Sequence, residues 1–189
     1  MRALLITFFT LFSLGSLQAA EVGDDGLHKQ PWFEATFKDI REDIETAADE
    51  NKRLAIIFEQ RGCPYCKQMH ETVFSDSEVV DYITEHFFVV QYNLHGSEEV
   101  TDLDGDVLPE NETAKKWGLK YTPTMLFFAE SAEENMSASN QAVAAMPGAA
   151  DKQTTMSMLH WVVESAYEGE EEFQDYHQRR VAGTGAPKS

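Results

Sequence analysis

The sequence predicts an α/β fold in which a mixed sheet is flanked by helices, and three patterns predict it. Apolar runs rich in β-branched and aromatic residues, typical of buried strands, occupy 54–58, 87–92 and 124–129. Segments with helical spacing separate the first two runs, which predicts strand–helix–strand units. A weaker strand pattern at 141–146, followed by a helix, predicts that the sheet ends in an antiparallel hairpin.

A helix is expected ahead of the first strand. Phe33, Phe37, Ile40, Ile44 and Ala48 recur every three or four residues, with charged residues between them. This spacing places them on one face, so we expect an amphipathic helix that begins at Phe33.

Two helices are expected between the first and second strands. Pro64 suits the first turn of a helix, which we expect to run to about Phe74. Ser75 and Glu78 form the S-x-x-E pattern of a capping box, so we expect the second helix to open at Ser75.

An acidic insertion is expected before the third strand. Residues 94–112 are polar, and Asp104-Gly105 is a turn signal, so we predict a loop or hairpin there. Asp102, Asp104 and Asp106 resemble part of a calcium loop, but the complete ligand pattern is absent. We therefore expect a turn with solvated carboxylates, followed by a short helix at 113–117.

The C-terminal part of the domain is expected to be a strand and a helix. Pro147-Gly148 should end the strand at 141–146, and Asp151 should cap the last helix. One face of that helix carries apolar residues, namely Met156, Leu159, Val163 and Tyr167.

The first twenty residues have the layout of a secretory signal. Met1-Arg2 is basic, Ala3 to Leu17 is almost wholly apolar, and Gln18-Ala19-Ala20 supplies small residues at the exit. We expect export to the periplasm with cleavage after Ala19 or Ala20. If the segment is retained as an anchor, the domain still lies outside the cytoplasm.

The remaining chain is expected to hold one domain. Residues 21–31 are predicted to be a flexible lead-in, 32–181 the folded domain, and 182–189 a disordered tail. Acidic residues outnumber basic ones 33 to 15, which argues against nucleic acid as a partner. No later apolar stretch is long enough to span a bilayer, so we expect no integral membrane protein once the signal is cleaved.

The chemistry is expected at the only two cysteines, Cys63 and Cys66. A bridge across C-x-x-C closes a tiny loop and restrains the unfolded chain little, so reactivity explains the pair better than stapling. Cys63 follows a strand and opens a helix, where unpaired N–H groups and the helix dipole favour a thiolate. We therefore expect Cys63 to be an exposed nucleophile and the more covered Cys66 to resolve the mixed disulfide.

A second element of the site is expected at Tyr121-Thr122-Pro123-Thr124, just before the third strand. Proline suits the start of a strand. A cis Thr122–Pro123 bond would turn the Thr122 backbone toward the dithiol, ready to pair with an extended substrate. Pro64, Tyr65, Thr122 and Pro123 are the predicted substrate-binding residues. No cofactor is expected besides the Cys63–Cys66 disulfide.

These motifs make residues 33–167 similar to the thioredoxin superfamily. Four stretches resemble exported bacterial members, above all the periplasmic thioredoxins of sulfur-oxidation systems (SoxW-like): 61–74, 93–96, 101–105 and 121–124. The resemblance implies a thioredoxin-like fold and a reductant that acts on thiols and disulfides of partner proteins. It also implies electron supply from a membrane thiol transporter.

The sequence departs from that family at the proton acceptor. Thioredoxins carry a buried Asp six residues before the first Cys, and Ile57 stands there in this chain. Glu59 is the candidate proton relay to Cys66, with an exposed charge at the strand end as the alternative. Gly62 also replaces the Trp that thioredoxins place before the first Cys.

Two other functions remain open on the sequence. Cys63, Cys66 and His70, one turn further on, are candidate ligands of a copper or zinc carrier. The same dithiol also serves oxidants and isomerases, which differ from reductants in reduction potential. A c-type haem is excluded because Lys67 stands where the ligand His is needed.

Overall fold

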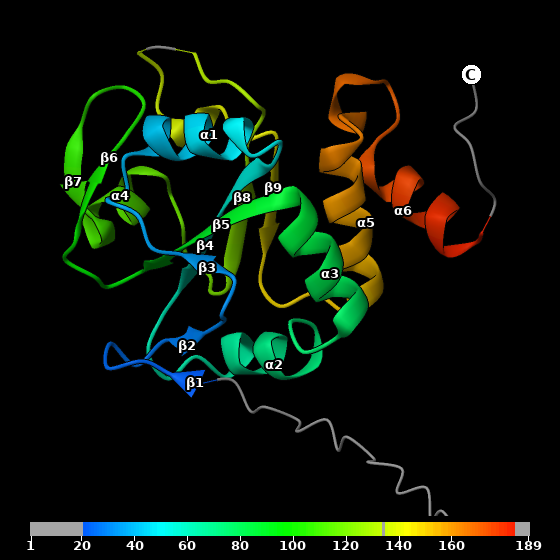
Figure 1. Cartoon of the computed structure of the whole chain (residues 1–189), viewed down its shortest axis with the longest axis horizontal. Helices are drawn as coiled ribbons and strands as arrows, with labels where there is room; N and C mark the ends of the chain where they lie inside the picture. The colour runs from blue at the N-terminus through cyan, green and yellow to red at the C-terminus, as the bar shows by residue number, and fades with distance from the viewer. Residues whose placement is uncertain (1–20, 134, 184–189) are drawn as a thin grey trace, which may run out of the picture.

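A computed structural model describes residues 21–133 and 135–183. Its core is a five-stranded mixed sheet in the order β3-β5-β4-β8-β9 (Figure 1). β5 runs parallel to β3 and β4, whereas β8 is antiparallel to both β4 and β9. The predicted mixed sheet and its terminal hairpin are thereby confirmed. The strands are β3 Phe33–Glu34, β4 Arg53–Glu59, β5 Phe87–Asn93, β8 Thr124–Phe127 and β9 Ala144–Pro147.

Helices cover both faces of this sheet. The helices are α1 Ile40–Asp49, α2 Pro64–Thr72, α3 Ser77–His86, α4 Glu110–Lys116, α5 Lys152–Val163 and α6 Phe173–Val181. α1 lies over one face, and α3 and α5 lie over the other (Figure 1). Among the described residues no helix has the length and apolar character needed to cross a membrane.

The central strand β4 joins two hydrophobic cores because its side chains alternate between the faces. Leu54, Ile56 and Phe58 pack on the side of α1. Ala55 and Ile57 point to the opposite side, toward α3 and α5. A strand buried on both faces explains the continuous apolar run in its sequence.

The helix predicted from Phe33 begins later. Phe33–Glu34 instead forms β3, whose backbone pairs with Val89 and Val90 of β5. α1 starts only at Ile40, because the Asp39 carboxylate accepts from the amides of Arg41 and Glu42 and fixes the helix start. The helical spacing of Phe33 and Phe37 therefore does not indicate helix, because both residues precede the Asp39 N-cap.

The predicted flexible lead-in is a folded hairpin. β1 Glu21–Val22 pairs with β2 His28–Lys29, and Leu27 between them is buried. Lys29 Nζ donates to Gln91 Oε1 on β5 at 2.7 Å, which fastens the hairpin to the sheet. The expected signal at 1–20 and most of the expected tail at 182–189 lie outside the described residues.

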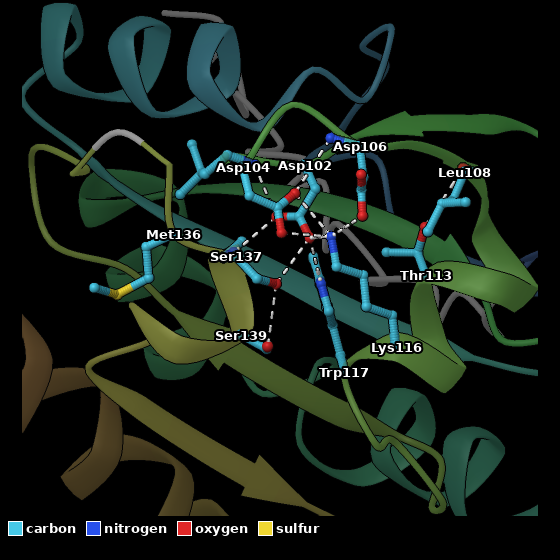
Figure 2. A network of polar contacts seen from close by, with 12 residues as sticks. Asp102, Asp104, Asp106, Leu108, Thr113, Lys116, Trp117, Met136, Ser137 and Ser139 are labelled. Atoms are coloured by element: carbon cyan, nitrogen blue, oxygen red, sulfur yellow. Dashed lines mark hydrogen bonds and ion pairs between the residues drawn. The ribbon is translucent and has the colours of Figure 1, made fainter.

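The acidic insertion is a hairpin of β6 Glu99–Thr101 and β7 Val107–Pro109, as expected. Its carboxylates are not simply solvated. Lys116 Nζ lies 2.6–2.9 Å from Asp102, Asp104 and Asp106, and Asp102 is buried (Figure 2). The ammonium group occupies the place between the three carboxylates, which satisfies them from within the chain.

Two smaller differences concern a helix start and a strand end, and a third is a helix that was not predicted. The Asp76 side chain caps α3, so the predicted start at Ser75 is wrong by one position. Pro147 belongs to β9, which is the edge strand where a missing N–H is tolerated. Sequence reasoning also missed α6, which packs on α5 through buried Tyr176; its hydroxyl donates to Glu164 at 2.7 Å.

Candidate redox site

The dithiol lies where β4 gives way to α2. Gly62 has a φ of 72°, a left-handed turn that glycine adopts without strain, and brings Cys63 to the N-cap of α2. Cys63 Sγ accepts a hydrogen bond from the Cys66 amide at 3.0 Å. Pro64 occupies the first helical turn, as predicted. The sulfur of Cys63 therefore receives an N–H that a helix start leaves unpaired, which favours a negative charge there.

The two cysteines form a disulfide, and both side chains are largely covered. Cys63 is 4% exposed and Cys66 is 1% exposed. Cys66 is the more covered of the two, as predicted. Cys63 was expected to be exposed, and this expectation is wrong. Thr122 covers it, because the cis-proline loop folds over the helix start.

That loop contacts the outer sulfur directly. The Thr122–Pro123 bond is cis. Cys63 Sγ lies 3.5 Å from the Thr122 carbonyl oxygen, and Thr122 Oγ1 donates to it at 3.3 Å. The loop itself is held by the Gly148 amide, which donates to the Pro123 carbonyl at 2.7 Å. The structure thus brings the Cys63–Cys66 pair together with Thr122 and Pro123, which lie far from it in the sequence.

Two tyrosines flank this contact and point outward. Tyr65, in the first turn of α2, is 61% exposed, and Tyr121, next to Thr122, is 68% exposed. Pro64 is exposed as well. Large exposed aromatic side chains beside a reactive group provide apolar contact area for a partner.

Glu59 is fully buried, so its alternative as an exposed charge at the strand end is wrong. Its carboxylate faces His70 Nε2 at 3.0 and 3.2 Å and accepts from Gln91 Nε2 at 2.5 Å. A buried carboxylate is stabilised in its charged form only when donors surround it, and α2 and β5 provide them here.

His70 is committed to this network and is not placed as a third ligand beside the cysteines. Its Nε2 faces Glu59, and its Nδ1 lies 3.0 Å from Gln30 Nε2, so both ring nitrogens are engaged. The rings of His28, Phe33 and Phe74 surround it at 5.2–5.8 Å. Within residues 21–133 and 135–183 no group of three His, Cys, Asp or Glu side chains is arranged to hold a metal ion. The ligand set of the metal-carrier alternative therefore lacks its third member.

Sequence reasoning missed the partners of Glu59. A glutamine within the apolar strand run, Gln91, was a usable signal, because a polar side chain in a buried strand needs a partner. The role of Gln30 had no signal, since the polar, glycine-containing segment around it is typical of flexible chain.

Comparisons with known proteins agree with this geometry. A family model of thioredoxin-like domains matches residues 40–160. The chain belongs to this thioredoxin-like family. No curated protein matches it.

Solved structures of thioredoxin-like proteins share the fold. A putative disulphide-isomerase from Bacteroides thetaiotaomicron is 27% identical, with a TM-score of 0.51 over 75% of this chain and 96% of that one. A thioredoxin-fold protein from Helicobacter pylori is 20% identical, with a TM-score of 0.51 over 77% and 92%. A thioredoxin from Thermus thermophilus is 22% identical, with a TM-score of 0.50 over 66% and 83%.

The thioredoxin-like fold and its dithiol together give the chain the chemistry of a thiol–disulfide oxidoreductase. The helix start favours a thiolate at Cys63, and Cys66 lies one turn further along α2. Ile57 is fully buried among apolar residues, and the one carboxylate that β4 carries belongs to Glu59, its last residue.

Proposed function

We propose that this chain is an exported thiol–disulfide oxidoreductase that keeps cysteines of partner proteins reduced. The contact of the Thr122 carbonyl with Cys63 Sγ is the observation that carries the proposal. It puts an exchange-competent sulfur beside a backbone edge at which an extended segment of a partner can pair.

The reaction is thiol–disulfide exchange in two steps. In the reduced protein the Cys63 thiolate attacks one sulfur of a partner disulfide, forms a mixed disulfide and releases the other sulfur as a thiolate. The Cys66 thiol then loses its proton, and its sulfur attacks Cys63 Sγ. The partner leaves as a second thiolate, and the Cys63–Cys66 disulfide of the structure remains.

Glu59 is proposed as the acceptor of the Cys66 proton. Its burial, and its position at the end of the strand that leads into the dithiol, support this role. Glu59→Gln keeps the size and removes the base, so we expect slower release of the mixed disulfide below pH 8. Equal release rates in the two proteins across pH 6–9 would exclude this role.

The proposed location is the periplasm, and the proposed electron donor is a membrane protein with a reactive thiol. The signal-like sequence of residues 1–20 supports export. The reducing direction and the donor rest on the resemblance to periplasmic thioredoxins of sulfur-oxidation systems. A measured reduction potential nearer −270 mV than −120 mV would agree with a reductant, and one near −120 mV would contradict it.

The activity is tested by reduction of insulin disulfides. Cys63→Ser should abolish the reduction, whereas Cys66→Ser should accumulate a mixed disulfide that mass spectrometry detects. Undiminished reduction by the Cys63→Ser protein would overturn the assignment. If the assignment holds, trapping of mixed disulfides by the Cys66→Ser protein in the native host would identify the substrate.

A further inference from the structure

Two cations beside the dithiol differ from most other cations of this acidic protein. Among Lys and Arg side chains of residues 21–133 and 135–183, those without a carboxylate within ion-pair distance are Arg41, Arg61 and Lys120. Arg41 belongs to α1 and faces the Leu103 carbonyl. The other two flank the redox site.

Arg61 precedes Cys63 by two residues and is exposed. Its guanidinium donates to the backbone carbonyls of Asp25 and Asp24 at 3.3 and 3.4 Å. The Asp25 carboxylate itself faces Lys29 at 2.6 Å. The N-terminal hairpin therefore holds Arg61 through backbone carbonyls, while no carboxylate lies within ion-pair distance of its guanidinium.

Lys120 precedes Thr122 by two residues and is exposed as well. It thus lies on the cis-proline loop, which contacts Cys63 from the other side. Exposed Tyr121 follows it, and exposed Tyr65 follows Cys63. Each segment that meets at the outer sulfur therefore carries one unneutralised cation and one exposed aromatic ring.

The charge of the whole chain makes this local arrangement informative. The formal net charge is −18, so carboxylates are abundant. Most Lys and Arg side chains of the described residues form an ion pair with one of them. Distant carboxylates are screened at physiological salt, where the screening length is about 8 Å. Arg61 and Lys120 are therefore the two cations near the dithiol that are left to pair with carboxylates of a partner.

We propose that the redox face, formed by Arg61, Tyr65, Lys120 and Tyr121 around Cys63, selects extended protein segments whose cysteine is flanked by acidic residues. This inference rests on the proposed thiol–disulfide exchange and names its substrate class. The rings contact the segment beside the cysteine, and the two cations pair with carboxylates on its flanks. Charges at the rim of a binding site act mainly on the rate of association and on partner choice.

The test uses synthetic substrates with one disulfide. Three disulfide-linked peptides differ only in the residues on either side of the cysteine, which are Asp, Ser or Lys. The second-order rate of attack by the reduced protein is measured at 0.15 M salt. Each rate is divided by the rate of the same peptide with a small dithiol, which removes differences in intrinsic reactivity.

We expect the Asp peptide to react about tenfold faster than the Lys peptide, an effect in the range that electrostatic steering gives. Lys120→Glu should remove this preference, because it replaces one of the two cations with an anion. Arg61→Gln is the second variant and should reduce the preference about threefold.

Lys52→Glu is the matched control, because it makes the same change of charge at the other end of β4. A strand of this length spans about 20 Å, more than two screening lengths. It should leave the preference unchanged. Equal rates for the three peptides, faster attack on the Lys peptide, or an equal effect of Lys52→Glu would overturn the proposal. Failure of all three peptides to react would instead contradict the proposed exchange activity itself.

Discussion

Two buried carboxylates of this protein have pKa values shifted in opposite directions, because different numbers of hydrogen-bond donors surround them. Asp102 accepts from Trp117, Ser137, the Ala138 amide and Lys116. Burial raises its pKa, but these donors outweigh burial and hold the pKa below its usual value. Asp43 on α1 has a side-chain donor in Thr36 at 3.2 Å. Burial there raises the pKa to about 6.

Asp43 therefore makes folding stability depend on pH. Its folded pKa lies above the unfolded value near 3.8, so the folded state binds the proton more tightly, and stability falls as pH rises from about 4 to 6. Asp43→Asn removes the charge and keeps an acceptor for Thr36. We expect it to raise the free energy of unfolding at pH 7 by about 1–3 kcal/mol and to have little effect at pH 4. Urea unfolding at both pH values measures this; equal stabilisation at both would contradict it. Asp49→Asn, an exposed change on the same helix, is the control.

At the scale of elements, one carboxylate joins segments that the sequence keeps apart. Asp102 follows β6, whereas its partners lie at the end of α4 and before β9 (Figure 2). The acidic hairpin is thereby attached to the body of the domain. The same residues looked like an incomplete calcium loop in the sequence, because spacing shows a cluster of acids but does not show that a lysine lies between them.

Asp102→Asn should loosen this attachment. The amide turns one acceptor into a donor among groups that already donate, which leaves buried N–H and O–H groups unpaired. We expect a loss of about 2–4 kcal/mol in the free energy of unfolding at pH 7. The more exposed Asp104→Asn, which keeps Asp102 in place, should cost less than about 1 kcal/mol. Similar losses of stability in the two variants would contradict the conclusion that Asp102 attaches the hairpin to the domain.

The elements also differ in how well the sequence predicts them. The apolar strands and the dithiol at a helix start were predictable, because periodicity and Pro64 are local signals. The start of α1 and the N-terminal hairpin were not. Phe33 has helical spacing from Ile40, yet pairing with Val89 and the cap at Asp39 decide its structure. The burial of Glu59 depends likewise on Gln91 and His70 from two other elements, so it is a property of the tertiary fold.

For the whole molecule, two electrostatic effects of opposite sign compete. Ion pairs join many side chains at the surface, and several of the acids in them are more than 40% exposed, such as Glu98, Glu130 and Glu78. Exposed pairs contribute little each. A formal net charge of −18 acts on every acidic group at once and favours expansion of the chain. We therefore infer that repulsion among the carboxylates outweighs the surface ion pairs at neutral pH.

Salt should accordingly stabilise the protein. Raising NaCl from 10 to 200 mM shortens the screening length from about 30 to below 10 Å, which weakens long-range repulsion more than contacts near 3 Å. We expect the thermal midpoint at pH 7 to rise by roughly 3–8 °C, which corresponds to about 1–3 kcal/mol for a domain of this size. Near pH 4.6, where the sequence pI lies, the rise should vanish. Differential scanning calorimetry at the two pH values makes the comparison. A midpoint that falls with salt at pH 7 would mean that the ion pairs outweigh the net charge.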